Sequence, residues 1–247
     1  MVLREKIKWW LFPGINLHAR LRYKILPRFF GTAQNNLLRI VLDAGCGNGM
    51  LAYQSYLRKN RVVGISINDN EVERCHKLFH DYLGISEDKL AFKVHNLYQI
   101  EALDLEIDEI ICSEVLEHIA DDKRVCQSFW NILKPEGILH LCCPNAKHPD
   151  NESKELDKNE SGGHVRSGYT METYKDLLEP IGFRIGSSVG IGGPIRQFFN
   201  KRIIQSEKTF CFPFAFIIFI VSLPFLVFDP STPSEPYSLY IRAEKKL

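Results

Sequence analysis

The chain has 247 residues, of which 45% are hydrophobic and 25% are charged. This length suffices for one sizeable α/β domain with insertions, with a core that needs neither disulfides nor metals. With 31 basic and 30 acidic residues the charge is nearly balanced, so no overall field favours nucleic acid as a partner. Seven cysteines without a Cys-x-x-Cys pair argue against a disulfide framework and favour the reducing cytosol.

The first 30 residues form a basic segment that is rich in aromatic side chains. Its charged residues are the basic Arg4, Lys6, Lys8, Arg20, Arg22, Lys24 and Arg28, against the single acidic Glu5. Such a composition suits an anionic interface. We therefore separate residues 1–30 from a main domain at residues 31–247.

Short β-branched runs alternate with helical patterns along the main domain. Strands are predicted at residues 40–44, 62–66, 90–94, 109–112, 138–142, 183–189 and 237–243. Helices are predicted at residues 50–59, 69–83, 121–133 and 171–178, the second of them capped by Asn68. A polar stretch at residues 144–167 has no periodicity, and loops of that length are usually functional or disordered. The alternation predicts an α/β fold with a parallel sheet built from βαβ units.

The stretch "VLDAGCGNG" is an apolar strand that ends in Asp43 and is followed by Gly45, Gly47 and Gly49. Glycines let the backbone turn sharply and approach a ligand, and the following helix offers free N–H groups. In the dinucleotide fingerprint the third glycine falls three residues after the second, so the spacing here is different.

This tight glycine run with its acidic residue resembles motif I of the class I S-adenosylmethionine-dependent methyltransferases. The stretches "DEIICSEVLEHI", "NILKPEGIL" and "CPN" follow in the order and spacing of that family's later motifs. The stretch "GGHVRSGYTMETYKDLLEPIGF" continues the pattern of its small-molecule and lipid-pathway members. The resemblance implies a doubly wound seven-stranded sheet with strand seven antiparallel, and S-adenosyl-L-methionine as cofactor. The alternative is a nucleotide-binding fold with another ligand.

The resemblance also implies a cofactor site at the ends of the first four strands. Asp43 would engage the ammonium of the methionine moiety, and Asn96 would contact the adenine. The full set of cofactor residues is Asp43, Gly45, Cys46, Gly47, Gly49, Ser66, Ile67, Asn96, Leu97, Ser113 and Glu114.

Ser66 departs from the family's pattern, which usually has an acidic residue at the end of strand two to bind both ribose hydroxyls. A hydroxyl cannot offer two charged oxygens, so each hydrogen bond is expected to be weaker. Asn68 or Asp69 is the candidate substitute, and a Ser66→Asp variant is expected to bind the cofactor more tightly. Ser66 also favours a different class of function, a cofactor-binding module or scaffold without turnover.

Four residues are candidates for contact with the methyl acceptor. Methyl transfer needs an aligned acceptor more than a reactive side chain, but a general base helps when the acceptor is a hydroxyl. His118 follows the tip of strand four, and its alternative role is packing. His164, Arg166 and Tyr169 follow two glycines that would let their loop close, with Arg166 pairing to a carboxylate or phosphate. The alternative role of His164 and Arg166 is to cap the next helix.

Two further pairs have simpler interpretations. Glu114 and Glu117 lack other ligands at metal-site spacing, so we expect no metal. Cys142 and Cys143 point to opposite faces of a strand, so we expect one of them to be buried.

The run "FCFPFAFIIFIVSLPFLVF" at residues 210–228 carries no charge, and its length approaches the roughly 20 residues of a membrane-spanning helix. It lies in an insertion at residues 190–236, between the sixth and seventh strands. Because the resemblance places both strands in one sheet, a single crossing is excluded. Pro213 and Pro224 interrupt helical bonding, which predicts a pair of short helices or a re-entrant hairpin.

Together these features predict methyl transfer to a small or lipid-linked acceptor, by O-methylation of a quinone-pathway phenol or a glycan. With the basic N-terminal segment, the insertion would contact the interface of a membrane from the cytoplasmic side. A lid over the acceptor pocket and a dimer surface are the alternatives for the insertion.

Overall fold

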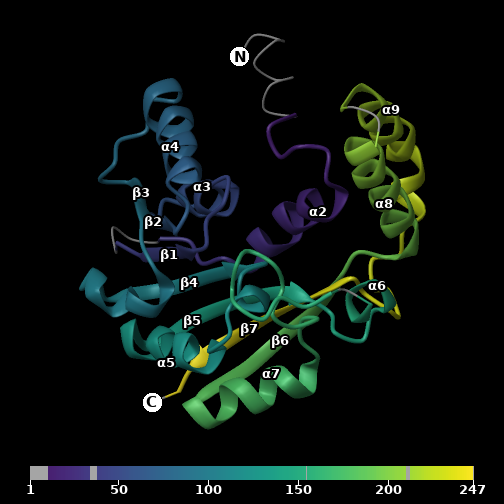
Figure 1. The fold of residues 1–247 in the computed structure, drawn as a ribbon. Helices are drawn as coiled ribbons and strands as arrows, with labels where there is room; N and C mark the ends of the chain where they lie inside the picture. The colour runs from purple at the N-terminus through teal and green to yellow at the C-terminus, as the bar shows by residue number, and fades with distance from the viewer. Residues whose placement is uncertain (1–10, 34–37, 154, 210–211, 247) are drawn as a thin grey trace.

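Seven strands form one sheet in the order β3-β2-β1-β4-β5-β7-β6 (Figure 1). The computed structural model describes residues 11–33, 38–153, 155–209 and 212–246. The strands are β1 (Ile40–Ala44), β2 (Arg61–Ser66), β3 (Leu90–Val94), β4 (Ile107–Ser113), β5 (Leu133–Pro144), β6 (Phe183–Ile191) and β7 (Ser238–Lys245). β7 pairs antiparallel with both β5 and β6, whereas the pairs among β1 to β5 are parallel. The predicted doubly wound fold is confirmed.

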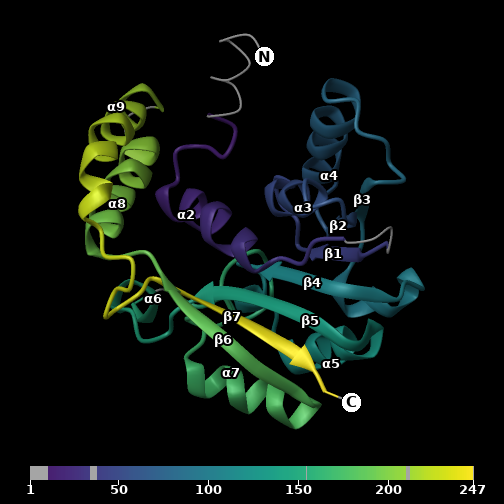
Figure 2. The same cartoon turned by 180° about the vertical axis from the view of Figure 1, so that it is seen from behind.

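Helices cover both faces of the sheet (Figures 1 and 2). One face carries α2 (Leu17–Ile25), η1 (Leu26–Phe29), α3 (Met50–Tyr56) and α4 (Asp69–Cys75), which continues as the π-helix η2 (His76–Tyr82). The other face carries α5 (Asp122–Ile132) and α7 (Met171–Leu178). The short elements are η3 (Leu97–Leu103), η4 (Leu116–His118), α6 (Pro149–Glu152) and η5 (Glu179–Ile181).

Because both faces are covered, consecutive strand residues are buried in different cores. Leu42 packs in the core below α5, and Val41 packs in the core below α3 and α4. Cys142 and Cys143 are likewise both fully buried, on opposite faces. The sequence predicted burial of one of them, and both are buried because helices cover both faces of the sheet.

The helix predicted at residues 69–83 begins as expected. The side chain of Asn68 accepts a hydrogen bond from the backbone N–H of Asn70 at 3.0 Å, which satisfies a free donor of the first turn. The predicted helix at residues 50–59 ends earlier, at Tyr56, and Lys59 takes a left-handed conformation with φ of 65°.

The insertion folds as a helical hairpin of α8 (Pro194–Thr209), α9 (Phe212–Ser222) and η6 (Leu223–Phe228). Pro213 lies in the first turn of α9, where no N–H donor is needed, and Pro224 lies in the first turn of η6. Residues 210 and 211 of the apolar run, like residues 1–10 of the basic segment, lie outside the described residues. Within the described ranges, no helix combines the length and apolar character that crossing a bilayer requires.

The hairpin packs against α2, an element that the sequence analysis did not predict. The backbone N–H of Leu17 donates to Asn200 Oδ1 at 2.8 Å, and Leu17, Ile203 and Phe219 share one small apolar cluster. The ring of His18 stacks on Tyr237 with centroids 4.2 Å apart. These contacts hold α2 between the hairpin and α3 (Figure 2), next to the ends of the parallel strands.

Candidate functional site

A cavity of about 430 Å³ lies where β1, β2, β3 and β4 end. This is the usual binding position in open α/β sheets, and the volume is ordinary for a small-molecule site. All of the predicted cofactor residues except Gly49 line the cavity: Asp43, Gly45, Cys46, Gly47, Ser66, Ile67, Asn96, Leu97, Ser113 and Glu114. Gly49 is the N-cap of α3 instead.

The glycine turn after β1 is shaped for a backbone that approaches a ligand. Gly45 has φ of 83°, and a Cβ there would lie 2.3 Å from a methyl carbon of Val115. Gly47 has φ of 50°, but nothing lies within 4 Å of the place where its Cβ would be. The first glycine is therefore required by packing, whereas the second leaves open space beside the cavity.

Asp43 lies at the base of the cavity and is 2% exposed. Its Oδ2 accepts a hydrogen bond from the backbone N–H of Ala52 at 2.9 Å, which ties β1 to α3. Burial raises the pKa of Asp43 to about 7, although this hydrogen bond acts in the opposite direction.

A carboxylate does lie beside Ser66, and it comes from α4. Ser66 Oγ donates to Glu71 Oε2 at 2.7 Å and accepts from the backbone N–H of Asn68 at 3.1 Å. Glu71 lines the cavity, whereas Asn68 and Asp69 do not belong to its lining. Glu71, in the first turn of α4, is therefore the lining carboxylate that contacts Ser66, whereas the predicted substitutes Asn68 and Asp69 lie outside the lining.

An ion pair crosses the opposite end of the cavity. Arg22 Nη1 on α2 lies 3.4 Å from Glu114 Oε2, with 13% and 25% of the two side chains exposed. Burial alone would lower the pKa of Arg22, but Glu114 and other nearby groups raise it. Glu114 has φ of 57°, an uncommon conformation for this residue type that often marks a functional position. The sequence showed Arg22 only as one cation in a basic run.

His118 lines the cavity and has a defined tautomer when it is neutral. Its Nδ1 lies 2.9 Å from the backbone oxygen of Gly163. Because a carbonyl only accepts, Nδ1 carries the hydrogen and Nε2 is left with a lone pair. His164 does not line the cavity, but its ring meets the His118 ring edge to face with centroids 4.7 Å apart.

Arg166 and Tyr169 contact Asp122 rather than the cavity. Arg166 also donates to the backbone oxygens of Ile119 and Ala120, at 2.6 and 2.9 Å. The Tyr169 hydroxyl donates to Asp122 Oδ2 at 2.5 Å, and burial raises the pKa of this tyrosine. Both side chains therefore fasten their loop to the start of α5.

The long polar loop reaches the rim of the cavity through Glu160. The hydroxyl of Tyr98 donates to Glu160 Oε1 at 2.6 Å, and the N–H of Val165 donates to the backbone oxygen of Glu117 at 2.8 Å. The Glu117 side chain is fully buried, and burial together with repulsion from Glu114 raises its pKa to about 8.

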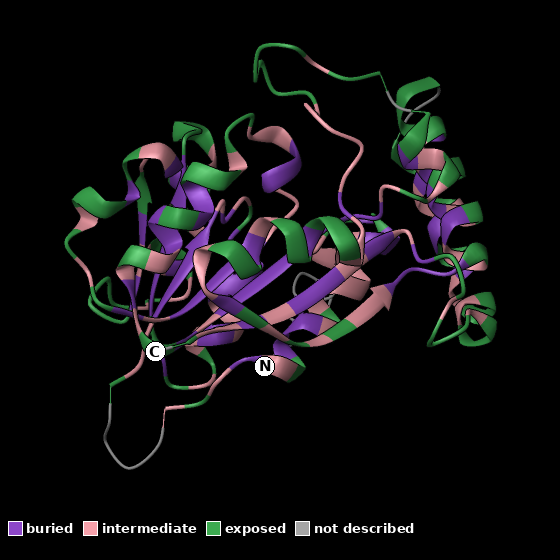
Figure 3. Cartoon of the chain, turned by 90° about the horizontal axis from the view of Figure 1, so that it is seen from below, coloured by how far each residue is buried: buried purple, intermediate pink, exposed green. Residues whose placement is uncertain are grey.

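The helical hairpin stands apart from the cavity, because no described residue from 194 to 228 belongs to the lining. Many of its residues are exposed (Figure 3), and several of these have large apolar side chains. Side chains between 53% and 76% exposed include Phe212, Ile217, Val221, Val227 and Phe228. The described structure therefore shows no contact between the hairpin and the cavity that would support a lid over the acceptor pocket.

The family model described as "Methyltransferase domain" matches residues 16–188 of the chain. The human mitochondrial ubiquinone biosynthesis O-methyltransferase is 27% identical over 161 residues, which cover 61% of this chain and 43% of that protein. The tRNA 5-carboxymethoxyuridine methyltransferase of Escherichia coli K12 is 35% identical over 108 residues, which cover 43% of this chain and 40% of that protein. The match thus spans less than half the length of either relative.

Solved structures share the architecture. The magnesium protoporphyrin IX methyltransferase from Synechocystis PCC 6803, solved with bound SAH, matches with a TM-score of 0.64 at 15% identity. The alignment covers 99% of this chain and 95% of that one. At this level of identity the likeness shows a common fold.

Proposed function

The chain belongs to the methyltransferase domain family of class I S-adenosylmethionine-dependent enzymes, and on this premise we propose that it transfers a methyl group from S-adenosyl-L-methionine to an acceptor oxygen. The observation that carries the proposal is the cavity itself. It joins an open glycine turn, the Ser66–Glu71 pair and the Arg22–Glu114 pair. The open turn leaves room for the cofactor beside the backbone. The Ser66–Glu71 pair suits the ribose hydroxyls of the cofactor, and the Arg22–Glu114 pair suits its zwitterionic amino-acid end.

The cavity residues divide between the parts of this cofactor. Arg22 binds the methionine carboxylate, and Asp43 and Glu114 attract the ammonium, because each pair brings opposite charges together in a partly dry site. Ser66 and Glu71 bind the ribose hydroxyls.

The adenine end takes the remaining residues. Ile67 is 74% exposed and lines the cavity, so it offers an apolar surface for the base. Asn96 and Leu97 contact the adenine edge, with Asn96 also capping η3 through a hydrogen bond from Tyr98 N at 2.9 Å.

The bound cofactor supplies a methyl carbon activated by a positive sulfur. His118 Nε2 would accept the proton of the acceptor hydroxyl, which makes that oxygen a better nucleophile toward the methyl group that the cofactor would supply. His164 holds the His118 ring from the side. Arg166 and Tyr169 act as positioning residues, because their polar atoms are committed to Asp122.

We propose a small or lipid-linked acceptor rather than nucleic acid. The formal net charge of +1 gives little attraction to a polyanion, although the E. coli relative is named for tRNA. The hairpin carries an exposed apolar surface, and Lys201, Arg202 and Lys208 on α8 are also exposed. This combination suits an anionic membrane interface, with the enzyme bound peripherally on the cytoplasmic side.

Flotation with vesicles tests the membrane part of this proposal. The chain is expected to float with anionic vesicles, and a Val227→Asp/Phe228→Asp variant is expected to remain unbound. Leu57→Asp is the matched control, because Leu57, at the end of α3 and outside the hairpin, is likewise exposed, at 54%. Equal flotation of all three proteins, or recovery of the native chain in the unbound fraction, would refute the interfacial contact.

Labelled methyl transfer tests the activity. The chain is incubated with methyl-labelled cofactor and, separately, with a lipid extract, an aqueous metabolite extract and total tRNA. Label is expected in the lipid or aqueous product, with about tenfold or more loss in His118→Gln. Label confined to tRNA would overturn the acceptor class. Cofactor binding without any labelled product would favour the non-catalytic module.

A further inference from the structure

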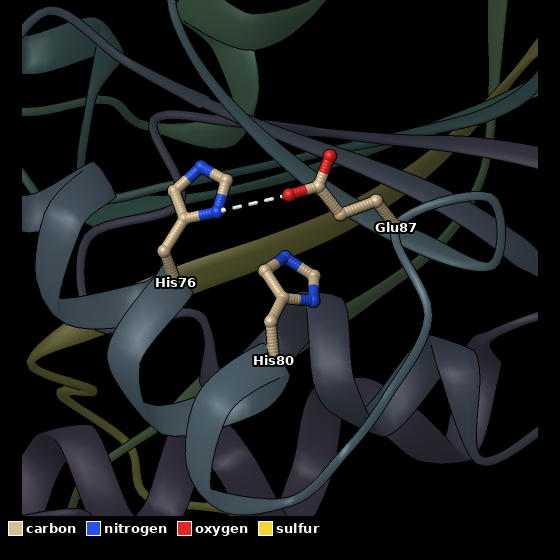
Figure 4. A group of neighbouring side chains, drawn as sticks. All are labelled: His76, His80 and Glu87. Atoms are coloured by element: carbon tan, nitrogen blue, oxygen red, sulfur yellow. Dashed lines mark ion pairs between the residues drawn. The ribbon is translucent and has the colours of Figure 1, made fainter.

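Two histidines and a glutamate meet outside the cavity, at the end of α4. His76 and His80 lie one turn apart on the π-helix η2, and Glu87 comes from the turn that leads into β3 (Figure 4). His76 Nδ1 is 3.5 Å from Glu87 Oε1. One ligand atom from each of the three residues lies within 4.8 Å of the other two. None of the three residues lines the cofactor cavity.

Backbone carbonyls fix the tautomer of each neutral ring. His80 Nδ1 lies 2.7 Å from the oxygen of Ile85, and His76 Nε2 lies 3.0 Å from the oxygen of Phe92. Because carbonyls only accept, those nitrogens carry the hydrogens. His76 Nδ1 and His80 Nε2 therefore keep lone pairs that point into the group. Such carbonyl contacts are the usual orienting partners of metal-ligating histidines.

One atom of the group, His80 Nε2, lacks a partner that a cation could supply. His80 Nε2 is buried and has no hydrogen-bond partner among the described residues. A proton on His76 would pair with Glu87 but would leave His80 Nε2 without a partner. One divalent ion can satisfy both lone pairs and the carboxylate at once.

We propose that His76, His80 and Glu87 bind one divalent ion of the zinc class. Two imidazole nitrogens and a carboxylate oxygen are a common zinc donor set, with bonds of about 2.0–2.2 Å and ligand atoms about 3.4 Å apart in a tetrahedron. The His76–Glu87 distance of 3.5 Å already fits this spacing. The Glu87 side chain is 69% exposed, so water can take the fourth position.

The ion has a structural role at this place. It joins the end of the α4–η2 helix to the turn before the edge strand β3, and none of its three ligands lines the cavity. The same helix carries Glu71 at its start. Zinc is therefore expected to raise the melting temperature without being required for methyl transfer, which separates this proposal from the proposed function.

The test is calorimetric titration of zinc chloride into the metal-free full chain, with any affinity tag removed. One equivalent is expected to bind, and at 100-fold excess over the dissociation constant the melting temperature is expected to rise by about 5 °C or more. In Glu87→Gln and in His80→Gln the affinity is expected to fall at least about tenfold. Cobalt in place of zinc is expected to give the visible absorption of a four-coordinate site.

His118→Gln is the matched control, because Glu117, His118 and His164 form the other three-residue group of possible metal ligands among the described residues. This variant is expected to keep full zinc affinity. Glu87 lies at the surface, and the metal-free Glu87→Gln protein is expected to melt at the native temperature. The proposal fails if the native chain binds no zinc, if Glu87→Gln and His80→Gln bind it as the native chain does, or if only His118→Gln loses it.

Discussion

From the Ser66–Glu71 pair we predict that Glu71, on α4, supplies the negative charge that binds the ribose hydroxyls of the cofactor. Glu71 Oε2 is 2.7 Å from Ser66 Oγ, and both residues line the cavity. A hydrogen bond to a charged acceptor contributes about 1.5–3 kcal/mol, against about 1 kcal/mol for a neutral one. Glu71→Gln keeps the shape and removes the charge, so we expect a loss of about 1.4 kcal/mol, or about tenfold in the Kd for S-adenosylmethionine.

Calorimetry with two ligands isolates this contribution. Glu71→Gln is expected to weaken S-adenosylhomocysteine binding about tenfold and to leave binding of its 2′,3′-dideoxy analogue unchanged. Glu73→Gln is the matched control, because Glu73 pairs with Lys77 at the surface and is not part of the cavity lining. Equal losses for both ligands, or no loss at all, would refute the role of Glu71.

The same pair reverses the expectation that Ser66→Asp tightens binding. An aspartate at this position would place a second carboxylate against Glu71, and like charges so close cannot both ionise freely. We therefore expect Ser66→Asp to bind the cofactor no more tightly than the native chain. Tighter binding by calorimetry would show that Glu71 does not occupy the ribose position.

Three further predictions concern the rest of the cavity. Arg22→Gln is expected to raise the Kd for the cofactor about tenfold by calorimetry, through loss of a charge-assisted pair; an unchanged Kd would contradict it. Asp43 has its pKa raised to about 7, so it is neutral at low pH. Cofactor affinity is expected to rise about tenfold from pH 5.5 to 7 as it ionises, and Asp43→Asn should remove this rise. Gly45→Ala is expected to lower the melting temperature more than Gly84→Ala in scanning calorimetry. Both glycines have positive φ, but only the Cβ at Gly45 would clash with Val115; equal effects would contradict this.

The strands β1, β2 and β4 were predictable because each is a largely apolar run rich in β-branched residues, which is typical of a sheet covered on both faces. The predicted and observed ranges are the same for β1 and β3 and nearly the same for β2. Helix α2 escaped prediction because only Leu17 and His18 of its nine residues are buried. Its packing is decided by α8, which is distant in sequence.

The candidate site was predictable where a residue ends a strand or follows it closely. Gly45, Gly47, Ser66, Asn96 and Glu114 are all of this kind, and all line the cavity. Arg22 and Glu71 reach the cavity from helices, so their positions depend on how those helices pack. Charge and spacing along the chain carry no signal for such positions.

Calorimetric titration of S-adenosylmethionine into the native chain and into Gly47→Asn tests most directly whether the cavity binds this cofactor. Nothing lies within 4 Å of the place of a Cβ at Gly47, and asparagine tolerates left-handed backbone, so the variant should keep its fold while its side chain occupies the cofactor's space. We predict one cofactor per native chain, competition by S-adenosylhomocysteine, and affinity at least about tenfold weaker in Gly47→Asn. Absence of binding by the native chain, or native affinity in the variant, would contradict the account.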